Sequence, residues 1–193
     1  VILSEAKNLL NAIFMKVLRY YQTSYIKGLI MINDICVKLA VNPILKKLNY
    51  IQFQFDGFVA ERMEANLENW LLSAPIANPA MIQMFRDQER QPNRDLLPWS
   101  GEFVGKYLIS AIQEWRINKD NHLKELIDEI VNELVDSQLP DGYLGPFPTD
   151  VRLVSDRWDV WGHYHWILAL LMYYQDTGYK HALDVCLKAG NLI

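Results

Sequence analysis

Two helical stretches of the chain repeat at a fixed offset, and this repeat constrains the fold more than any other sequence feature. At an offset of 57 positions, residues 105–107 (GKY) align with residues 162–164 (GHY), and Leu126 aligns with Leu183. A repeat of this length accommodates two helices joined by a turn, and such units bury their apolar sides by stacking on one another. The repeat therefore predicts an all-α protein of stacked αα-hairpins, arranged as an open solenoid or a closed toroid.

Apolar residues recur at spacings of three and four along most of the chain after residue 55, as in helices that bury one face. The pattern is clearest in 120–138, where the apolar residues lie opposite the charged ones. The predicted helices are 56–75, 79–86, 100–118, 120–138, 158–177 and 180–192. The side chains expected to bound them are Asp56, Ser100 and Asp120 as N-caps, and Pro75 as the end of the first helix.

Composition and charge limit the classes of function. The chain has 193 residues, of which 51% are hydrophobic, so it can bury a core. Its net charge of −4 includes no basic run, so nucleic acid is not an expected partner. Charges interrupt the apolar run 26–41 and no signal-peptide pattern precedes it, so we expect a soluble chain without a membrane span and leave its compartment open.

The first 50 residues carry the least information. Gly28 and Pro43 are their only helix breakers, which favours a mostly helical segment, and whether this segment belongs to the same domain as residues 51–193 is left open. Cys36 and Cys186 are 150 positions apart and lack zinc-ligand spacing. We therefore expect two buried thiols, and neither a metal site nor a cofactor within this chain.

The segment 158–165 concentrates aromatic, acidic and imidazole side chains at the start of a helix. Trp158, Asp159, His163 and His165 lie within these eight residues. Aromatic rings stack on the C–H faces of sugars, and carboxylates and imidazoles bind their hydroxyl groups. Alternatively, the tryptophans belong to the core, Asp159 caps the helix, and the histidines bond to backbone carbonyls.

In a toroid, the loops at one end of the inner helices converge on a central pocket. Three stretches, 99–106, 141–144 and 158–165, lie at such positions in this chain. Two of their acidic residues have simpler roles: Glu102 can pair with Lys106 on the helix surface, and Asp141 can shape its turn. The candidate substrate-binding residues are Trp99, Glu102, Lys106, Tyr143, Trp158, Asp159, His163 and His165.

The same three stretches, WSGEFVGKYL, QLPDGYLG and RWDVWGHYHWILALLMYYQDTG, resemble in this order the N-terminal part of a known catalytic domain. That domain defines glycoside hydrolase family 127, the β-L-arabinofuranosidase family, and the resemblance covers about Phe55 to Ile193. It implies an (α/α)6 barrel, of which residues 51–193 would be an incomplete N-terminal portion. It also implies retaining hydrolysis of an arabinofuranoside, with a zinc-held cysteine as nucleophile and a glutamate as acid/base.

The family's catalytic positions lie in the later part of its barrel, so the resemblance transfers no nucleophile, acid/base or zinc ligand to this chain. Zinc is implied only for the full-length family. Better-known members open the last-but-one helix with a stretch like His-Glu-Leu-Tyr-Cys, so Trp158 stands where their sugar-contacting histidine would be. His165 falls where the family often has a histidine.

These observations lead to two hypotheses. The first is a fragment of a glycoside hydrolase that carries part of the carbohydrate pocket, is inactive alone, and self-associates through an exposed apolar face. The second is a non-catalytic helical-repeat module that binds a protein or a carbohydrate. Neither hypothesis specifies the sugar or the linkage.

Overall fold

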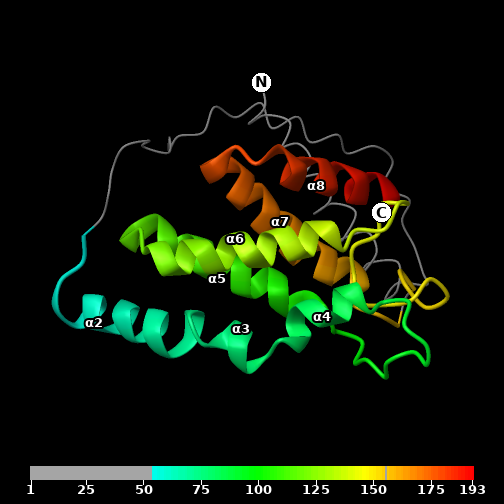
Figure 1. Ribbon diagram of the computed structural model, residues 1–193, viewed down its shortest axis with the longest axis horizontal. Coiled ribbons are helices and arrows are strands. Elements are labelled where there is room, and N and C mark those ends of the chain that lie inside the picture. Colours follow the sequence, from blue (N-terminus) through cyan, green and yellow to red (C-terminus); the bar gives the residue numbers. More distant parts are fainter. Residues whose placement is uncertain (1–53, 155) are drawn as a thin grey trace, which may run out of the picture.

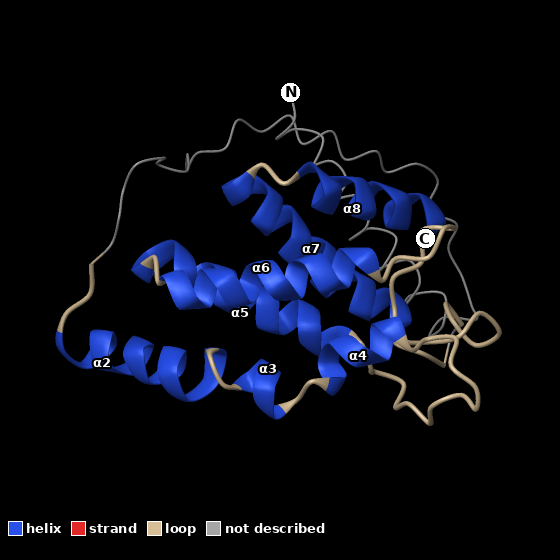
Figure 2. Cartoon of the chain, viewed as in Figure 1, coloured by secondary structure: helices blue, strands red, loops and turns tan. Residues whose placement is uncertain are grey.

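The computed structural model describes residues 54–154 and 156–193, and every regular element within these ranges is a helix (Figure 2). The all-α prediction is confirmed, whereas the helical interpretation of residues 1–50 lies outside the described residues, as does Cys36. No helix in the described part is long and apolar enough to cross a membrane. The elements are α2 (Gly57–Asn66), the π-helix η1 (Leu67–Leu71), α3 (Ala74–Ala77), α4 (Ala80–Arg86), α5 (Glu102–Asn118), α6 (Asn121–Asp136), α7 (Asp159–Thr177) and α8 (Lys180–Leu192).

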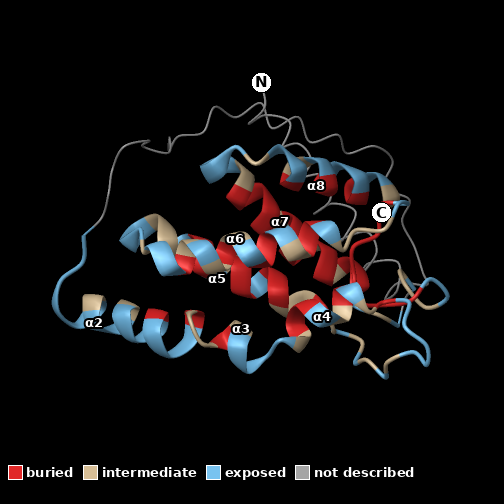
Figure 3. Cartoon of the chain, viewed as in Figure 1, coloured by how far each residue is buried: buried red, intermediate tan, exposed pale blue. Residues whose placement is uncertain are grey.

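Helices α5 and α7 pack side by side and run in the same direction (Figure 1). At their N-terminal ends, a Cβ added to Gly162 would lie 3.7 Å from the backbone nitrogen of Glu102. At their C-terminal ends, Nε of Arg116 donates to Oδ2 of Asp176 at 2.7 Å. Most residues of α7 are themselves buried (Figure 3), as expected for a helix enclosed by neighbouring helices.

Helices α5 and α6 form one antiparallel hairpin, and helices α7 and α8 form another. Near the turn between α5 and α6, Nζ of Lys124 lies 5.4 Å from the centroid of the Trp115 ring. Beyond the end of α6, Nε2 of Gln138 donates to the backbone oxygen of Val185 in α8 at 2.9 Å. The hairpins α5–α6 and α7–α8 therefore stack on one another, which confirms the arrangement that the sequence repeat predicts.

The predicted helix ends are correct in part. Asp120 caps α6, since its carboxylate accepts from the backbone N–H of Leu123 at 2.6 Å. Ser100 does not cap α5, because Gly101 occupies the N-cap position with a φ of 98°, which favours glycine. Helix α8 spans Lys180–Leu192, the predicted range, and α7 ends at Gly178 in the left-handed conformation.

The helix predicted over 56–75 is wrong in its second half. Five residues form the π-helix η1, and Pro75 lies in the first turn of α3 instead of ending the preceding helix. Asp56 occupies the N-cap position of α2 but its side chain makes no cap hydrogen bond. None of the residues of α2 is buried, and 68% of the Phe58 surface is exposed.

Candidate functional site

The loop 139–148 brings Tyr143 against the first turn of α7. Oδ1 of Asp141 accepts from the backbone N–H of Tyr143 at 3.1 Å, and Gly142 has a φ of 98°, so the two residues form the predicted tight turn. This turn directs the Tyr143 ring inward, where it is fully buried. The guanidinium of Arg152 lies 4.5 Å from the centroid of this ring and also pairs with Asp141.

Asp159 is the first residue of α7, and it is only 2% exposed. Its Oδ2 accepts from the hydroxyl of Tyr143 and from the backbone N–H of Leu153, both at 3.0 Å. The Tyr143 hydroxyl in turn accepts from the backbone N–H of Phe147 at 3.2 Å. Burial and the neighbouring Asp159 charge raise the pKa of Tyr143 well above its usual range, so Tyr143 remains a donor to the carboxylate.

His163 joins this network one turn further along α7. Its Nδ1 donates to the backbone oxygen of Asp159 at 2.9 Å and lies 3.4 Å from Oδ1 of the same residue. The ring is fully buried, and its centroid lies 5.3 Å from that of Tyr143. Tyr143, Asp159 and His163 therefore form one buried group that ties the loop to α7, although Nε2 of His163 has no hydrogen-bond partner among the described residues.

A second group lies where α5 faces α7. Nζ of Lys106 pairs with Oε1 of Glu102 at 2.7 Å, as the spacing of four residues predicts. His165 is buried on α7 and interacts electrostatically with both charges. Gly105 makes this approach feasible, since a Cβ at its position would lie 2.7 Å from Cβ of His165.

Two polar atoms of this second group have unmet hydrogen-bonding capacity. Oε2 of Glu102 and Nε2 of His165 are both buried, and neither has a hydrogen-bond partner among the described residues. Burial lowers the pKa of His165, and the Lys106 ammonium lowers it further, while Glu102 opposes the change. The imidazole is therefore neutral near pH 7, and Nε2 can donate or accept depending on its tautomer.

The His165 pKa predicts a pH dependence of stability. Because the folded state lowers the pKa, the stabilisation from neutral His165 is present above the ordinary value of 6.5 and is lost as the pH falls below it. In urea unfolding between pH 7.5 and 5, we expect His165→Gln to lose less stability than wild type. The matched control, His181→Gln, changes an exposed histidine of α8 and should follow wild type. Parallel curves for wild type and His165→Gln would contradict this assignment.

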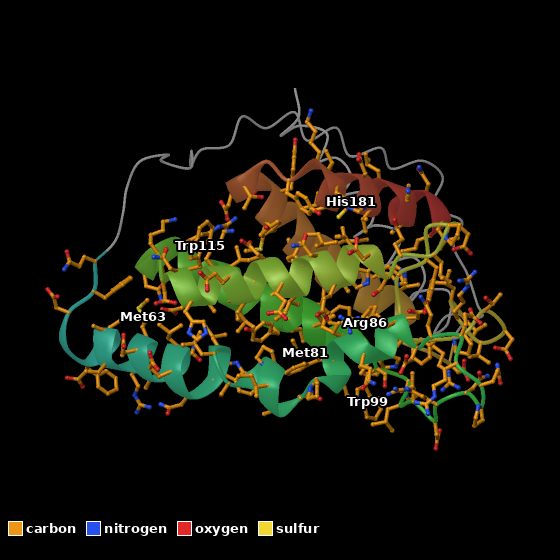
Figure 4. All side chains as sticks on the ribbon, viewed as in Figure 1. Met63, Met81, Arg86, Trp99, Trp115 and His181 are labelled. Atoms are coloured by element: carbon orange, nitrogen blue, oxygen red, sulfur yellow. The ribbon has the colours of Figure 1, made fainter. Side chains whose placement is uncertain are left out.

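Trp99 and Trp158 lie at the outer edge of the same helix ends. Their ring centroids are 6.0 Å apart, and both rings are about half exposed. Figure 4 shows Trp99 on the loop side of the molecule, at the opposite end of the helix layer from Trp115. The eight predicted residues thus gather at one end of α5 and α7, as a buried group, an ionic group and an exposed aromatic pair.

Sequence reasoning missed the residues that allow this close packing. A Cβ on Gly145 would lie 2.3 Å from the Tyr143 hydroxyl, so the loop needs glycine there. The alignment of Gly105 with Gly162 in the repeat was the available signal for the α5–α7 contact. Nothing in the sequence pattern pointed to Arg152, whose partners Asp141 and Tyr143 lie earlier in the same irregular connection between α6 and α7.

The described residues do not form a metal site. No group of three or more His, Cys, Asp or Glu side chains within residues 54–154 and 156–193 is arranged to hold a metal ion. The Cys186 thiol is fully buried, and its burial raises its pKa, which disfavours the thiolate that zinc requires. The zinc that the family resemblance implies is expected to be held by the later part of the family's barrel, so it stays a prediction.

Two hollows in the described part lie away from these eight residues. One, of about 430 Å³, is bordered by α3, α4 and α6, and includes Ile76 and Glu129. The other, of about 570 Å³, lies between α2 and the end of α5, and includes Glu64 and Glu114. None of the eight candidate residues lines either of these hollows.

Stacked αα-hairpins whose neighbouring helices run in parallel are typical of α/α toroid proteins. This chain forms part of such a toroid. The chain matches the family described as beta-L-arabinofuranosidase, GH127 catalytic domain, over residues 45–193. Because this match spans most of the chain, the protein belongs to that family. No curated protein matches the chain.

The fold is also similar to a crystal structure of a GH127 beta-L-arabinofuranosidase from Geobacillus stearothermophilus T6. The TM-score is 0.59 at 20% sequence identity, and the similarity covers 72% of this chain and 24% of the other. At this identity the likeness concerns the fold alone. The chain spans about a quarter of the length of that arabinofuranosidase.

Proposed function

We propose that the N-terminal ends of α5 and α7 form one wall of the sugar-binding pocket of a GH127 glycoside hydrolase. The observation that carries this proposal is the pair of buried, unpartnered atoms, Oε2 of Glu102 and Nε2 of His165. Buried polar atoms are normally satisfied, so atoms left free at a helix end favour a hydroxylated ligand. A sugar hydroxyl can donate to Glu102 while a neighbouring hydroxyl pairs with neutral His165.

In this proposal the charges of the wall select an uncharged ligand. The Lys106 ammonium already neutralises Glu102 at 2.7 Å, and the lowered pKa of His165 keeps its ring neutral. A sugar hydroxyl would therefore contact polar groups that together carry no net charge. The Tyr143–Asp159–His163 group supports the wall from behind, since it fixes the loop and the first turn of α7.

The proposal assigns no nucleophile and no acid/base to this chain. Retaining hydrolysis requires a nucleophile and an acid/base about 5 Å apart on either side of the scissile bond. Asp159 is buried and accepts two hydrogen bonds, and Glu102 is paired with Lys106. The proposed contribution of these residues is to bind and orient the sugar, with chemistry supplied by other parts of a complete barrel.

A binding measurement tests this proposal. Glu102→Gln should weaken binding of methyl β-L-arabinofuranoside to the 193-residue chain about tenfold, because a neutral amide replaces the charged acceptor of the hydroxyl hydrogen bond. Affinity would be measured by ligand-observed NMR titration. Glu125→Gln, which changes an exposed glutamate of α6, is the matched control and should leave the affinity unchanged. Equal affinities for Glu102→Gln and wild type would contradict the proposal, and would favour a helical module with a different ligand.

A further inference from the structure

The exposed aromatic pair Trp99–Trp158 is not explained by the packing of the fold. Both indoles are half exposed, at 46% and 47%, although large aromatic side chains usually bury most of their surface. Their ring centroids are 6.0 Å apart and their planes are tilted by 59°. Each ring keeps part of its apolar surface available to a ligand.

Backbone hydrogen bonds fix this pair in place. The N–H of Trp158 donates to the backbone oxygen of Pro98 at 2.8 Å, which joins the loop before α5 to the start of α7. The N–H of Ser100 donates to the backbone oxygen of Leu97 at 2.9 Å, which closes the turn that carries Trp99. A ligand that stacks on these rings therefore meets a surface that is already ordered, which lowers the entropic cost of binding.

The pair is also continuous with the proposed hydroxyl-binding groups. Trp158 directly precedes α7, and the backbone oxygen of Trp99 accepts from the N–H of Glu102 at 3.5 Å. Glu102 and His165 lie further along the helices, whereas the two indoles lie at the outer edge. A ligand held by Glu102 and His165 would have its outer part beside these rings.

We propose that Trp99 and Trp158 form a stacking platform for a second sugar ring, attached to the sugar that Glu102 and His165 hold. This inference rests on the proposed function and extends it to the substrate class, namely glycosides with at least two rings. Indole faces attract the C–H faces of a sugar ring without requiring a charge or a specific hydroxyl. The platform therefore favours two-ring ligands over one-ring ligands. It does not select a particular second sugar.

The test compares a one-ring and a two-ring ligand. For the 193-residue chain, a β-linked L-arabinofuranosyl disaccharide should bind about three- to tenfold more tightly than methyl β-L-arabinofuranoside in NMR titrations. Trp99→Ala and Trp158→Ala should each reduce this difference, because they weaken binding of the two-ring ligand more than binding of the methyl glycoside. Trp115→Ala, at the opposite end of α5 (Figure 4), is the control and should preserve the difference.

The possible results distinguish the platform from the proposed function. Equal affinities of wild type for the two ligands would overturn the platform alone, because the first sugar would still bind. Equal losses for both ligands in Trp99→Ala and Trp158→Ala would also overturn it, because the indoles would then act on the first sugar. Binding of neither ligand would overturn both the platform and the proposed function.

Discussion

Gly105→Ala is expected to lower the free energy of unfolding by about 3 kcal/mol, the upper range for overpacking a core. The added Cβ would lie 2.4 Å from the backbone nitrogen of Trp166 and 2.5 Å from the carbonyl carbon of His165. Because both atoms belong to the main chain of α7, a side-chain rotation cannot relieve the clash. The helices α5 and α7 would have to move apart, and urea unfolding would measure the loss.

The repeat provides a matched control for this substitution. Gly162 is the partner of Gly105 in the sequence alignment and faces the same interface from α7. A Cβ added there would have its nearest contact at 3.7 Å, an ordinary van der Waals distance. Gly162→Ala should therefore be neutral or gain up to about 1 kcal/mol from helix propensity. Equal stability of the two variants would show that α5 and α7 are not in the close contact described.

Asp159→Ala is expected to cost about 3 kcal/mol of unfolding free energy, because it breaks a buried hydrogen-bonded group. The substitution leaves the backbone N–H of Leu153 and the hydroxyl of Tyr143 without their common acceptor. Tyr143→Phe keeps the carboxylate and its Leu153 donor but removes the acceptor of the Phe147 N–H, and should cost about 2 kcal/mol. Urea unfolding at pH 7 would measure both variants.

An exposed aspartate serves as the control for this prediction. Asp184 lies on the outer surface of α8, so Asp184→Ala should change stability by less than about 0.5 kcal/mol. If Asp159→Ala were as mild as Asp184→Ala, the carboxylate would have to be solvated. That result would favour direct contact between Asp159 and a ligand over the supporting role proposed above.

The sequence predicted those parts of the fold that depend on local patterns. The range of α8, the cap at Asp120 and the end of α7 at Gly178 all follow from apolar spacing and from side chains adjacent in the chain. The π-helix and the start of α5 at Gly101 were not predicted. Gly101 is constrained by tertiary contact, since a Cβ there would lie 2.7 Å from the Pro146 ring, 45 positions away in sequence.

The candidate site shows the same division between local and tertiary information. The ion pair of Glu102 with Lys106 follows from their spacing on one helix. The sequence left Asp159 with two roles, a helix cap or a pocket residue, and the structure shows a third arrangement. Its carboxylate accepts from Tyr143 and Leu153, which lie ten positions apart in the irregular connection between α6 and α7. Helix periodicity carries no information about such partners.

Whether a sugar binds at the N-terminal ends of α5 and α7 is tested most directly by recording ¹H–¹⁵N spectra during the titration with methyl β-L-arabinofuranoside. The account predicts saturable shifts of the Glu102 and His165 amides, with little change at Trp115. Shifts confined to residues around either of the two hollows, or no saturable shifts at all, would contradict it.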